Sequence, residues 1–212
     1  MNEPGKRSLN YPLRRREVVQ ELLKSREGLL VVAGLGAPAW DATASGDHPL
    51  TFPLWGGMGG AVSIGLGLAL AQPNQRVLVI TGDGEMLMGL GSLSTVGLQQ
   101  PENLAVVVLD NEHFGETGMQ TTHTAGSVNL AEIARASGIS SSWTVRESSE
   151  ISTTREKLLY EEGPLFCGIK VRAETLTLVL PTKKGGILQK RFRNALVNEN
   201  GDGSELTYSK HR

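Results

Sequence analysis

Cysteine is nearly missing from this chain, which has one, Cys167, in 212 residues. A single cysteine excludes a disulfide scaffold, a cysteine-rich zinc site and a cysteine-ligated iron–sulfur cluster. The chain also lacks an apolar run of the roughly 18 residues that a membrane span requires, and its first residues lack the apolar core of a signal peptide. We therefore expect a cytoplasmic protein without a membrane segment.

An excess of charge of one sign is missing too. The chain has 21 Lys and Arg against 22 Asp and Glu, so nothing in its charge indicates binding to nucleic acid or to a membrane surface. Aromatic residues are only 5%, whereas the 26 glycines exceed the usual share. The glycines concentrate in residues 28–126 beside apolar runs, which indicates loops that approach a ligand closely.

Short apolar runs alternate with helical patterns, which predicts an α/β fold with a mostly parallel sheet in three layers, α/β/α. We expect strands over residues 29–33, 76–81, 104–110, 142–145 and 164–171. We expect helices over 12–27, 59–72, 86–98, 130–137, 149–160 and 185–197, and irregular backbone over 46–57 and 111–128. The chain then divides into a basic N-terminal helix (1–28), the α/β domain (29–182), and a basic C-terminal helix with a mobile tail (183–212).

Two glycine loops are candidate binding loops. The first, residues 34–39, follows a predicted strand and fits the G-x-G-x-x-G/A fingerprint of dinucleotide sites. That fingerprint also needs a second strand with an acidic end about 20 residues on, and prolines interrupt the chain there. A nicotinamide or flavin module therefore stays an alternative.

The second loop is Gly82-Asp83-Gly84, between a predicted strand and the following helix. Its glycines let the backbone approach an anion, and Asp83 can hold a cation that neutralises the anion. The next predicted strand ends in Asp110-Asn111. Because neighbouring parallel strands end at the same edge of a sheet, a carboxylate and an amide oxygen meet there, as suits Mg²⁺ bound to a phosphate.

This pattern resembles the cofactor motif of thiamine diphosphate (ThDP) enzymes, in which GDG is followed by a spacer and (N/D)N. Met58, 25 residues before Asp83, matches the large apolar residue that bends the cofactor in 2-oxo acid decarboxylases, and the small residues of 58–70 resemble the helix that follows it. The resemblance covers residues 29–172. The chain looks most similar to the β subunits or C-terminal halves of sulfopyruvate and phosphonopyruvate decarboxylases.

The resemblance implies a role for individual residues. Asp83 and Asn111 would bind Mg²⁺ through their side chains, and His113 through its backbone carbonyl. The loop Gly82–Glu85 would approach the diphosphate, with Gly84 and Glu85 donating backbone N–H groups. The Glu85 carboxylate must then turn away from the diphosphate or meet a base, and Asp110 adds a negative charge near the metal.

The other cofactor contacts come from two further loops. The loop that contains Gly34, Gly36 and Ala37 would cover the other side of the diphosphate. The Gly56 carbonyl would accept a hydrogen bond from the aminopyrimidine, and Met58 would lie beneath the bend of the cofactor.

The polar segment after Asn111 would face the substrate. Glu116 and Thr117 are candidates for proton transfer or substrate contact, with a surface carboxylate as the alternative for Glu116. Gln120 and Thr121 are candidates for binding an anionic substrate tail. The tryptophans are interpreted as packing residues: Trp40, Trp55 and Trp143.

The resemblance also implies a partner. ThDP needs a glutamate from a pyrimidine-binding domain to activate its aminopyrimidine, and this chain has no room for that domain. We therefore expect a hetero-oligomer in which a pyrimidine-binding (alpha) subunit supplies the glutamate. It would decarboxylate a small 2-oxo acid to CO₂ and an aldehyde. The alternatives are a carboligase subunit of the acetolactate synthase type, another 2-oxo acid enzyme subunit, or a noncatalytic ThDP-fold protein.

Overall fold

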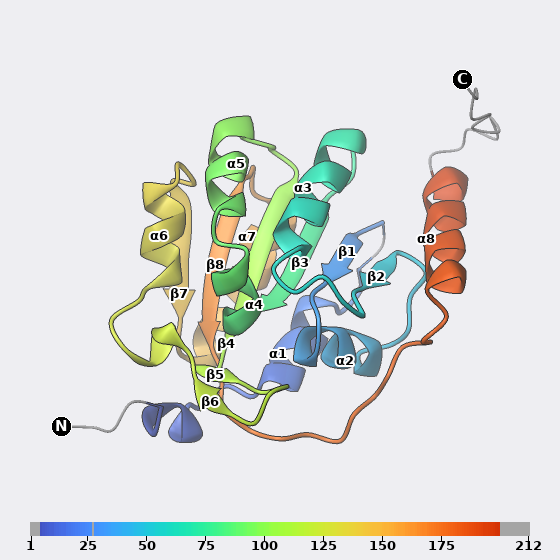
Figure 1. The fold of residues 1–212 in the computed structure, drawn as a ribbon. Coiled ribbons are helices and arrows are strands. Elements are labelled where there is room, and N and C mark those ends of the chain that lie inside the picture. The colour runs from blue at the N-terminus through green and yellow to red at the C-terminus, as the bar shows by residue number, and fades with distance from the viewer. Residues whose placement is uncertain (1–4, 27, 200–212) are drawn as a thin grey trace.

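Six short apolar segments pair side by side as parallel strands, so the predicted α/β fold is confirmed (Figure 1). The computed structural model describes residues 5–26 and 28–199. The strand order across the sheet is β2-β1-β3-β4-β8-β7. The strands are β1 (Leu30–Ala33), β2 (Thr51–Pro53), β3 (Val77–Gly82), β4 (Leu104–Asp110), β7 (Ser141–Val145) and β8 (Leu165–Lys170).

Helices cover both faces of this sheet, which gives the three predicted layers. On one face lie α1 (Arg15–Leu22), α2 (Ala37–Ala44) and α7 (Ile151–Tyr160). On the other lie α3 (Ala61–Ala71), α5 (Ser92–Gln99) and α6 (Leu130–Ala136). Consecutive residues of β4, Val106 and Val107, are both fully buried in opposite cores. A strand with apolar residues on both sides is typical of a parallel sheet covered on two faces.

The helix predicted over residues 86–98 is wrong in one respect, because it is two helices. Helix α4 (Asp83–Met88) ends at Gly89, and α5 begins at Ser92. A Cβ on Gly89 would lie 2.0 Å from the carbonyl oxygen of Gly59. The helix is therefore interrupted at Gly89, where the backbone that precedes α3 packs against it. The spacing of apolar residues does not reveal this contact.

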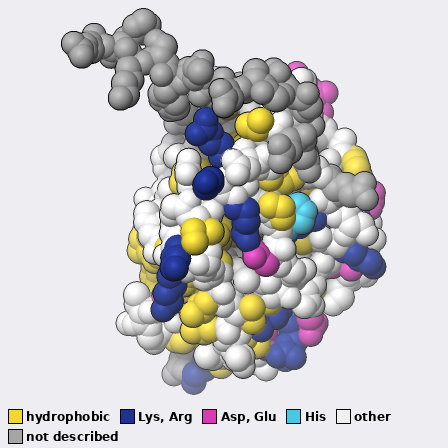
Figure 2. Space-filling model, turned by 90° about the vertical axis from the view of Figure 1, so that its right-hand side faces the viewer, with side chains coloured by type: hydrophobic (Ala, Val, Ile, Leu, Met, Phe, Trp, Pro, Cys, Tyr) yellow, Lys and Arg dark blue, Asp and Glu magenta, His cyan; other side chains and the backbone are white. Residues whose placement is uncertain are grey.

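The prediction of irregular backbone over 46–57 also needs correction, because β2 lies within it. Pro53 is compatible with a strand here because β2 is at the edge of the sheet. Helix α8 (Gly185–Glu199) packs against β2, with the rings of Phe192 and Phe52 5.5 Å apart. Figure 2 shows Lys and Arg side chains interleaved with apolar ones down this side of the molecule.

Four shorter elements follow β4. The polar segment after β4 contains a small hairpin, β5 (His113–Phe114) and β6 (Gln120–Thr121), and then the 3-10 helix η2 (His123–Ala125). A 3-10 turn, η3 (Ser148–Glu150), leads into α7.

The two ends of the chain differ from the expected pattern. Helix α1 is shorter than the predicted helix over 12–27, and a separate turn, η1 (Arg7–Asn10), precedes it. The tail predicted to be mobile includes residues 200–212, which lie outside the described residues. Within residues 5–26 and 28–199, no helix is long and apolar enough to cross a membrane.

Candidate functional site

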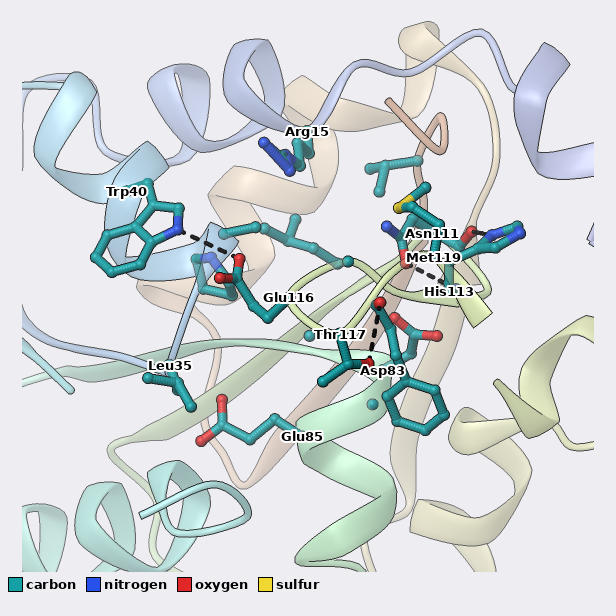
Figure 3. A pocket seen from close by; sticks show the side chains of 18 of the residues that line it. Arg15, Leu35, Trp40, Asp83, Glu85, Asn111, His113, Glu116, Thr117 and Met119 are labelled. Atoms are coloured by element: carbon teal, nitrogen blue, oxygen red, sulfur yellow. Dashed lines mark hydrogen bonds between the residues drawn. The ribbon is translucent and has the colours of Figure 1, made fainter. Parts of the chain in front are cut away.

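A cavity of about 410 Å³ opens where β3 and β4 end, at the carboxyl edge of the sheet (Figure 3). Loops in this position form the ligand sites of open parallel sheets, and the volume suits a small organic ligand. The predicted site residues that line it are Ala37, Met58, Gly82, Asp83, Gly84, Glu85, Asn111, His113, Glu116 and Thr117. The fold therefore brings most of the predicted site together.

Asp83 begins α4 directly after β3 and is 2% exposed. Its Oδ2 accepts a hydrogen bond of 2.6 Å from Thr122 Oγ1 and lies 3.2 Å from Thr124 Oγ1. Burial, and then the charge of Asp110, raise the pKa of Asp83 well above its usual range. A buried carboxylate of this kind is stabilised by a cation beside it.

Asn111 and His113 follow β4, next to Asp83, because β3 and β4 pair in parallel with Gly82 opposite Leu109. The Asn111 side-chain oxygen accepts a hydrogen bond of 2.9 Å from the His113 backbone N–H, while His113 Nδ1 lies 2.9 Å from the Asn111 carbonyl. The side chain of His113 is thus turned toward its own loop.

The donor set fits a magnesium ion shared with a phosphate. In the described part of the chain, no group of three or more His, Cys, Asp and Glu side chains is arranged to hold a metal. Asp83 and Asn111 offer one carboxylate and one amide oxygen. Mg²⁺ is commonly held by one or two such ligands, with phosphate oxygens and water completing the octahedron.

The additional charge of Asp110 is offset by Lys170 from the end of β8. Lys170 Nζ lies 2.7 Å from Asp110 Oδ2 and 3.0 Å from Glu112 Oε1, and its side chain is 8% exposed. Strand β8 pairs with β4 so that Lys170 stands opposite Asp110. Asp110, which was predicted to add a negative charge near the metal, is therefore paired with Lys170 from the neighbouring strand β8.

Glu112 ties the N-terminal segment to this loop. Its fully buried carboxylate accepts hydrogen bonds from Arg7 Nε at 2.9 Å and Tyr11 Oη at 2.7 Å. Burial alone would raise the pKa of Glu112, but hydrogen bonds from Arg7, Tyr11 and Lys170 outweigh burial and lower it. Sequence reasoning missed this residue because its partners are far away in the chain.

The resemblance requires the Glu85 carboxylate to turn away from the diphosphate or to meet a base, and in the structure this carboxylate points away from Asp83. Its carboxylate accepts a hydrogen bond of 2.7 Å from Thr81 Oγ1, and the residue is 5% exposed. Figure 3 shows it pointing toward Leu35 and away from Asp83.

The first glycine loop leads into α2, whose first residue, Ala37, lines the cavity. Gly36 has a φ of +80°, and a Cβ there would lie 2.7 Å from Glu116 Cγ. Glu116 accepts a hydrogen bond of 3.3 Å from Trp40 Nε1. Glu116 thus reaches across the cavity from the β4 side to α2 (Figure 3).

Five other predicted residues are placed less centrally. Gln120 and Thr121, in β6, do not line the cavity, and Gln120 instead hydrogen-bonds Thr117. Gly34, Gly36 and Gly56 do not line it either, although Leu35, Ala37 and Met58 from the same loops do.

Sequence reasoning missed several residues that line the cavity from other parts of the chain. Trp40 was interpreted as packing, yet its indole meets Glu116. Arg15, from α1, lines the cavity and pairs with Asp41 at 3.0 Å. Glu174, from the segment after β8, lines it too and pairs with Arg14. No pattern in the neighbouring residues distinguishes these three, because tertiary packing of α1, α2 and the segment after β8 brings them to the site.

Comparison with protein families places this geometry among known proteins. Residues 37–169 match the family described as "Thiamine pyrophosphate enzyme, C-terminal TPP binding domain"; thiamine pyrophosphate is another name for ThDP. The match spans β2, β3 and β4 and both loops that hold Asp83 and Asn111.

Individual relatives agree. The chain is similar to sulfopyruvate decarboxylase subunit beta of Methanocaldococcus jannaschii, with 42% identity over 61% of this chain and 68% of the relative. The corresponding protein of Methanothermobacter thermautotrophicus is 38% identical over 76% of this chain and 83% of the relative. Phosphonopyruvate decarboxylase of Streptomyces viridochromogenes is 33% identical over 90% of this chain but only 47% of that protein.

A solved structure supports the fold. A putative thiamin diphosphate-dependent enzyme from Mycobacterium smegmatis superimposes with a TM-score of 0.66 at 20% identity, over 77% of this chain and 32% of that one. The chain thus spans about a third of that enzyme's length.

Proposed function

The chain belongs to the thiamine pyrophosphate enzymes, as their C-terminal TPP-binding domain, and on that premise we propose that it is the cofactor-binding subunit of a heteromeric 2-oxo acid decarboxylase. The observation that carries the proposal is the pair Asp83 and Asn111 beside one cavity at the ends of β3 and β4. The names of the relatives, sulfopyruvate and phosphonopyruvate decarboxylases, support decarboxylation of a small 2-oxo acid with a second acidic group. We place the reaction in the cytoplasm.

In this proposal Asp83 and Asn111 hold Mg²⁺ through side-chain oxygens, and His113 holds it through its carbonyl. Asp83 is deprotonated when the ion is bound, because the ion offsets the burial and the repulsion from Asp110 that raise its pKa. Asn111 must release its hydrogen bond to the His113 N–H, or share that oxygen, to reach the ion.

The diphosphate lies between the two glycine loops. Gly84 and Glu85 donate backbone N–H groups from the first turn of α4, and Gly82 leaves space because a Cβ there would meet nothing within 4 Å. On the other side, Gly34, Gly36 and Ala37 lead into α2. Pro38 has no N–H and the Ala39 and Trp40 N–H groups donate to the Gly34 and Gly36 carbonyls, so the Ala37 N–H is the group of this turn that would face the diphosphate.

The aminopyrimidine lies toward Gly56 and Met58. The Gly56 carbonyl accepts its hydrogen bond, and Met58 supports the bend of the cofactor. Met58 is 37% exposed at the cavity, so a cofactor resting on it would bury apolar surface.

Bound ThDP supplies an electron sink for breaking the bond to the carboxylate carbon of the substrate. Glu116 is the candidate to hold or deliver a proton, and the hydrogen bond from Trp40 orients its carboxylate. Thr117 contacts the substrate beside it. Gln120 and Thr121, which lie outside the cavity, would bind an anionic tail only if the hairpin moved toward the site.

A partner subunit is supported by the outer surface of α3, α4 and α5. Ile64, Leu70, Met88 and Leu98 are each 40–79% exposed there. Apolar side chains gathered on one side of a molecule are typical of a protein interface. The partner, a pyrimidine-binding (alpha) subunit, would supply the activating glutamate, and the relatives named subunit beta support this arrangement.

Calorimetric titration with ThDP and Mg²⁺ tests the proposal, in the presence of the co-expressed pyrimidine-binding subunit. We expect metal-dependent binding to the wild-type chain and a loss of at least about tenfold in affinity for Asp83→Ala, since a charge-assisted metal contact is lost. Asp47→Ala is the matched control, because Asp47 pairs with Arg191 beside α8. Its affinity should equal that of the wild type.

The same complex is then supplied with sulfopyruvate, phosphonopyruvate and pyruvate. Release of CO₂ and an aldehyde supports a decarboxylase, whereas a new carbon–carbon bond in the product supports a carboligase. Equal ThDP affinity of the wild type and Asp83→Ala would contradict the proposed cofactor site.

A further inference from the structure

Arg15 is the one Lys or Arg among the described residues that line the cavity. It is the first residue of α1, and its side chain is 8% exposed. Figure 3 shows it at the side of the cavity away from Asp83. Neither the proposed metal site nor the proposed diphosphate site uses this charge. A buried guanidinium group beside a ligand cavity is a candidate for binding an anionic group of the ligand.

The carboxylate next to Arg15 does not use up its charge. Arg15 Nε lies 3.0 Å from Asp41 Oδ2, but neither atom makes a hydrogen bond of normal geometry. The other oxygen, Asp41 Oδ1, accepts a hydrogen bond of 2.8 Å from Arg16 Nε. Two cations therefore share one buried carboxylate, and these three side chains carry one excess positive charge. An excess charge at a buried place is stabilised when an anion binds to it.

The two arginines are directed to different places. Arg16 Nη2 donates a hydrogen bond of 2.9 Å to the Thr177 carbonyl, and Arg16 does not line the cavity. Within residues 5–26 and 28–199, no side-chain hydrogen bond occupies the Nη groups of Arg15, which does line the cavity. Arg15 is therefore the arginine of this pair with N–H donors left for a ligand.

The acidic side chains that line the cavity leave Arg15 available. Asp83 is the proposed metal ligand, and the Glu85 carboxylate points away toward Leu35 (Figure 3). Glu174 Oε2 accepts hydrogen bonds from the guanidinium group of Arg14, at 2.6 Å from Nη2 and 3.0 Å from Nε.

Glu116 is the remaining acidic side chain of the cavity. Its carboxylate accepts a hydrogen bond from the Trp40 indole, and no ion pair holds it within the described residues. A test of Arg15 must therefore separate its effect from that of Glu116.

The surroundings of Arg15 strengthen an interaction with an anion. Trp40, Leu176 and Leu178 line the same cavity, and an apolar lining reduces the screening of charge by water. Gln120 and Thr121, which were predicted to bind an anionic substrate tail, lie outside the cavity.

We propose that Arg15 is a specificity-determining residue whose guanidinium group binds the second acidic group of the substrate, a sulfonate or phosphonate at the end of the 2-oxo acid remote from the reacting carboxylate. The inference rests on the proposed function and deepens it. A planar guanidinium group presents parallel N–H donors that match the oxygens of such a group. The site thereby distinguishes substrates with a second acidic group from substrates with an uncharged end.

Binding of 3-phosphonopropionate tests the inference in the complex of the full chain with the pyrimidine-binding subunit, without cofactor. This compound has the carboxylate and the phosphonate of phosphonopyruvate but no 2-oxo group to react. Calorimetry should show at least about tenfold weaker binding for Arg15→Gln, because a charge-assisted hydrogen bond is lost. Arg15→Lys should recover part of the affinity, since it keeps the charge without the planar fork. Affinity for butyrate, in which a methyl group replaces the phosphonate, should change much less.

Arg16→Gln is the matched control. It removes the neighbouring cation of Asp41 but no group that lines the cavity. Both variants should lower the melting temperature, because each leaves Asp41 with one arginine. Arg16→Gln should nevertheless bind 3-phosphonopropionate as the wild type does. Equal losses of affinity in the two variants would overturn the inference, because the loss would then follow from the pairing with Asp41.

Steady-state kinetics with ThDP and Mg²⁺ test the same role during turnover. For Arg15→Gln, kcat/KM should fall at least about tenfold more for sulfopyruvate and phosphonopyruvate than for 2-oxobutyrate, and the difference should lie mainly in KM. Glu116→Gln should instead lower kcat for all three substrates. Equal losses for charged and uncharged substrates in Arg15→Gln would contradict a role in specificity.

Failure of the proposed function is distinguishable from failure of this inference. If the wild-type complex binds no ThDP, the proposed function is wrong, but binding of 3-phosphonopropionate to the cofactor-free complex still decides the role of Arg15. If the wild type binds ThDP and releases CO₂ while Arg15→Gln binds 3-phosphonopropionate unchanged, the role of Arg15 is overturned and the proposed function stands. Absence of 3-phosphonopropionate binding to the wild type would also overturn the inference.

Discussion

Lys170 is the residue that allows two acidic side chains to lie beside the proposed metal site. Its ammonium group pairs with Asp110 at 2.7 Å and Glu112 at 3.0 Å, and all three side chains are buried. Burying one of these charges alone would be costly, whereas the paired set is tolerated. Because Lys170 neutralises Asp110 and Glu112, Asp83 is the one of these three carboxylates that a bound cation would stabilise most.

Glu112 occupies a backbone conformation that few side chains adopt, with a φ of +65°. Such a conformation persists when the surrounding contacts determine it. Here Arg7, Tyr11 and Lys170 all bond the carboxylate. The turn that carries Asn111 and His113 is therefore held from the N-terminal segment and from β8.

Replacing Glu112 by Gln should destabilise the chain by about 2 kcal/mol, because Arg7 loses its charged partner and Lys170 keeps only Asp110. Urea unfolding at neutral pH measures the free energy of unfolding. Glu132→Gln is the control, since Glu132 pairs with Arg135 at an exposed site, where such a pair contributes under about 1 kcal/mol. Equal midpoints for the two variants would mean that the Glu112 contacts add no stability.

Among the elements, the break between α4 and α5 is the clearest case in which periodicity misled the prediction. The apolar spacing of residues 86–98 is helical throughout, but the structure contains two helices. The cause is a close approach of two backbones at Gly59 and Gly89. Contacts of this kind join residues about one βαβ unit apart, so a local pattern does not contain them.

Gly89→Ala should destabilise the fold by about 2 kcal/mol, because the new Cβ meets the Gly59 carbonyl at 2.0 Å and neither backbone moves easily. Thermal unfolding monitored by circular dichroism measures the effect. Gly91→Ala provides the control, since a Cβ there meets nothing within 4 Å and its φ of −60° suits alanine. A melting temperature equal to that of Gly91→Ala would show that the approach is easily relieved.

The edge strand β2 is a strand that local sequence patterns did not predict. Prolines and glycines in residues 46–57 indicated irregular backbone, and the strand that forms is only three residues long. It is stabilised by β1 on one side and by α8, nearly 140 residues later, on the other. Tertiary packing here overrides weak local propensity.

At the scale of the whole molecule, helix α3 exposes apolar side chains on its outer side, away from the sheet. Helix α3 carries apolar or small residues on nearly all sides. Val62 and Leu66 do lie in the core, but Ile64 and Leu70 are 40% and 52% exposed. An outer apolar surface on this helix is consistent with the proposed partner subunit.

Ile64→Lys should leave the melting temperature of the isolated chain nearly unchanged, because the side chain is exposed. It should nevertheless abolish co-purification with the pyrimidine-binding subunit, because a charge would be buried in the interface. Tyr160→Lys, on α7 across the sheet and 73% exposed, is the control. Size-exclusion chromatography of co-expressed subunits measures the complex. If Ile64→Lys assembles as well as the control, the partner binds elsewhere.

The sequence by itself determined most of the strands and helices, the parallel sheet, and the placement of Asp83 and Asn111 at one edge. These follow from local periodicity and from the rule that neighbouring parallel strands end together. The resemblance also implied that the Glu85 carboxylate must turn away from the diphosphate or meet a base.

Only the tertiary structure decided where that carboxylate goes and what surrounds the cavity. Thr81 is close to Glu85 in sequence, but Gly34 lies against the Glu85 carboxylate only because β1 pairs with β3. Lys170 meets Asp110 because β8 pairs with β4, and Trp40 meets Glu116 because α2 crosses the site. Such contacts join residues 51 to 76 positions apart, so they depend on how elements pack and leave no signature in the residues next to them.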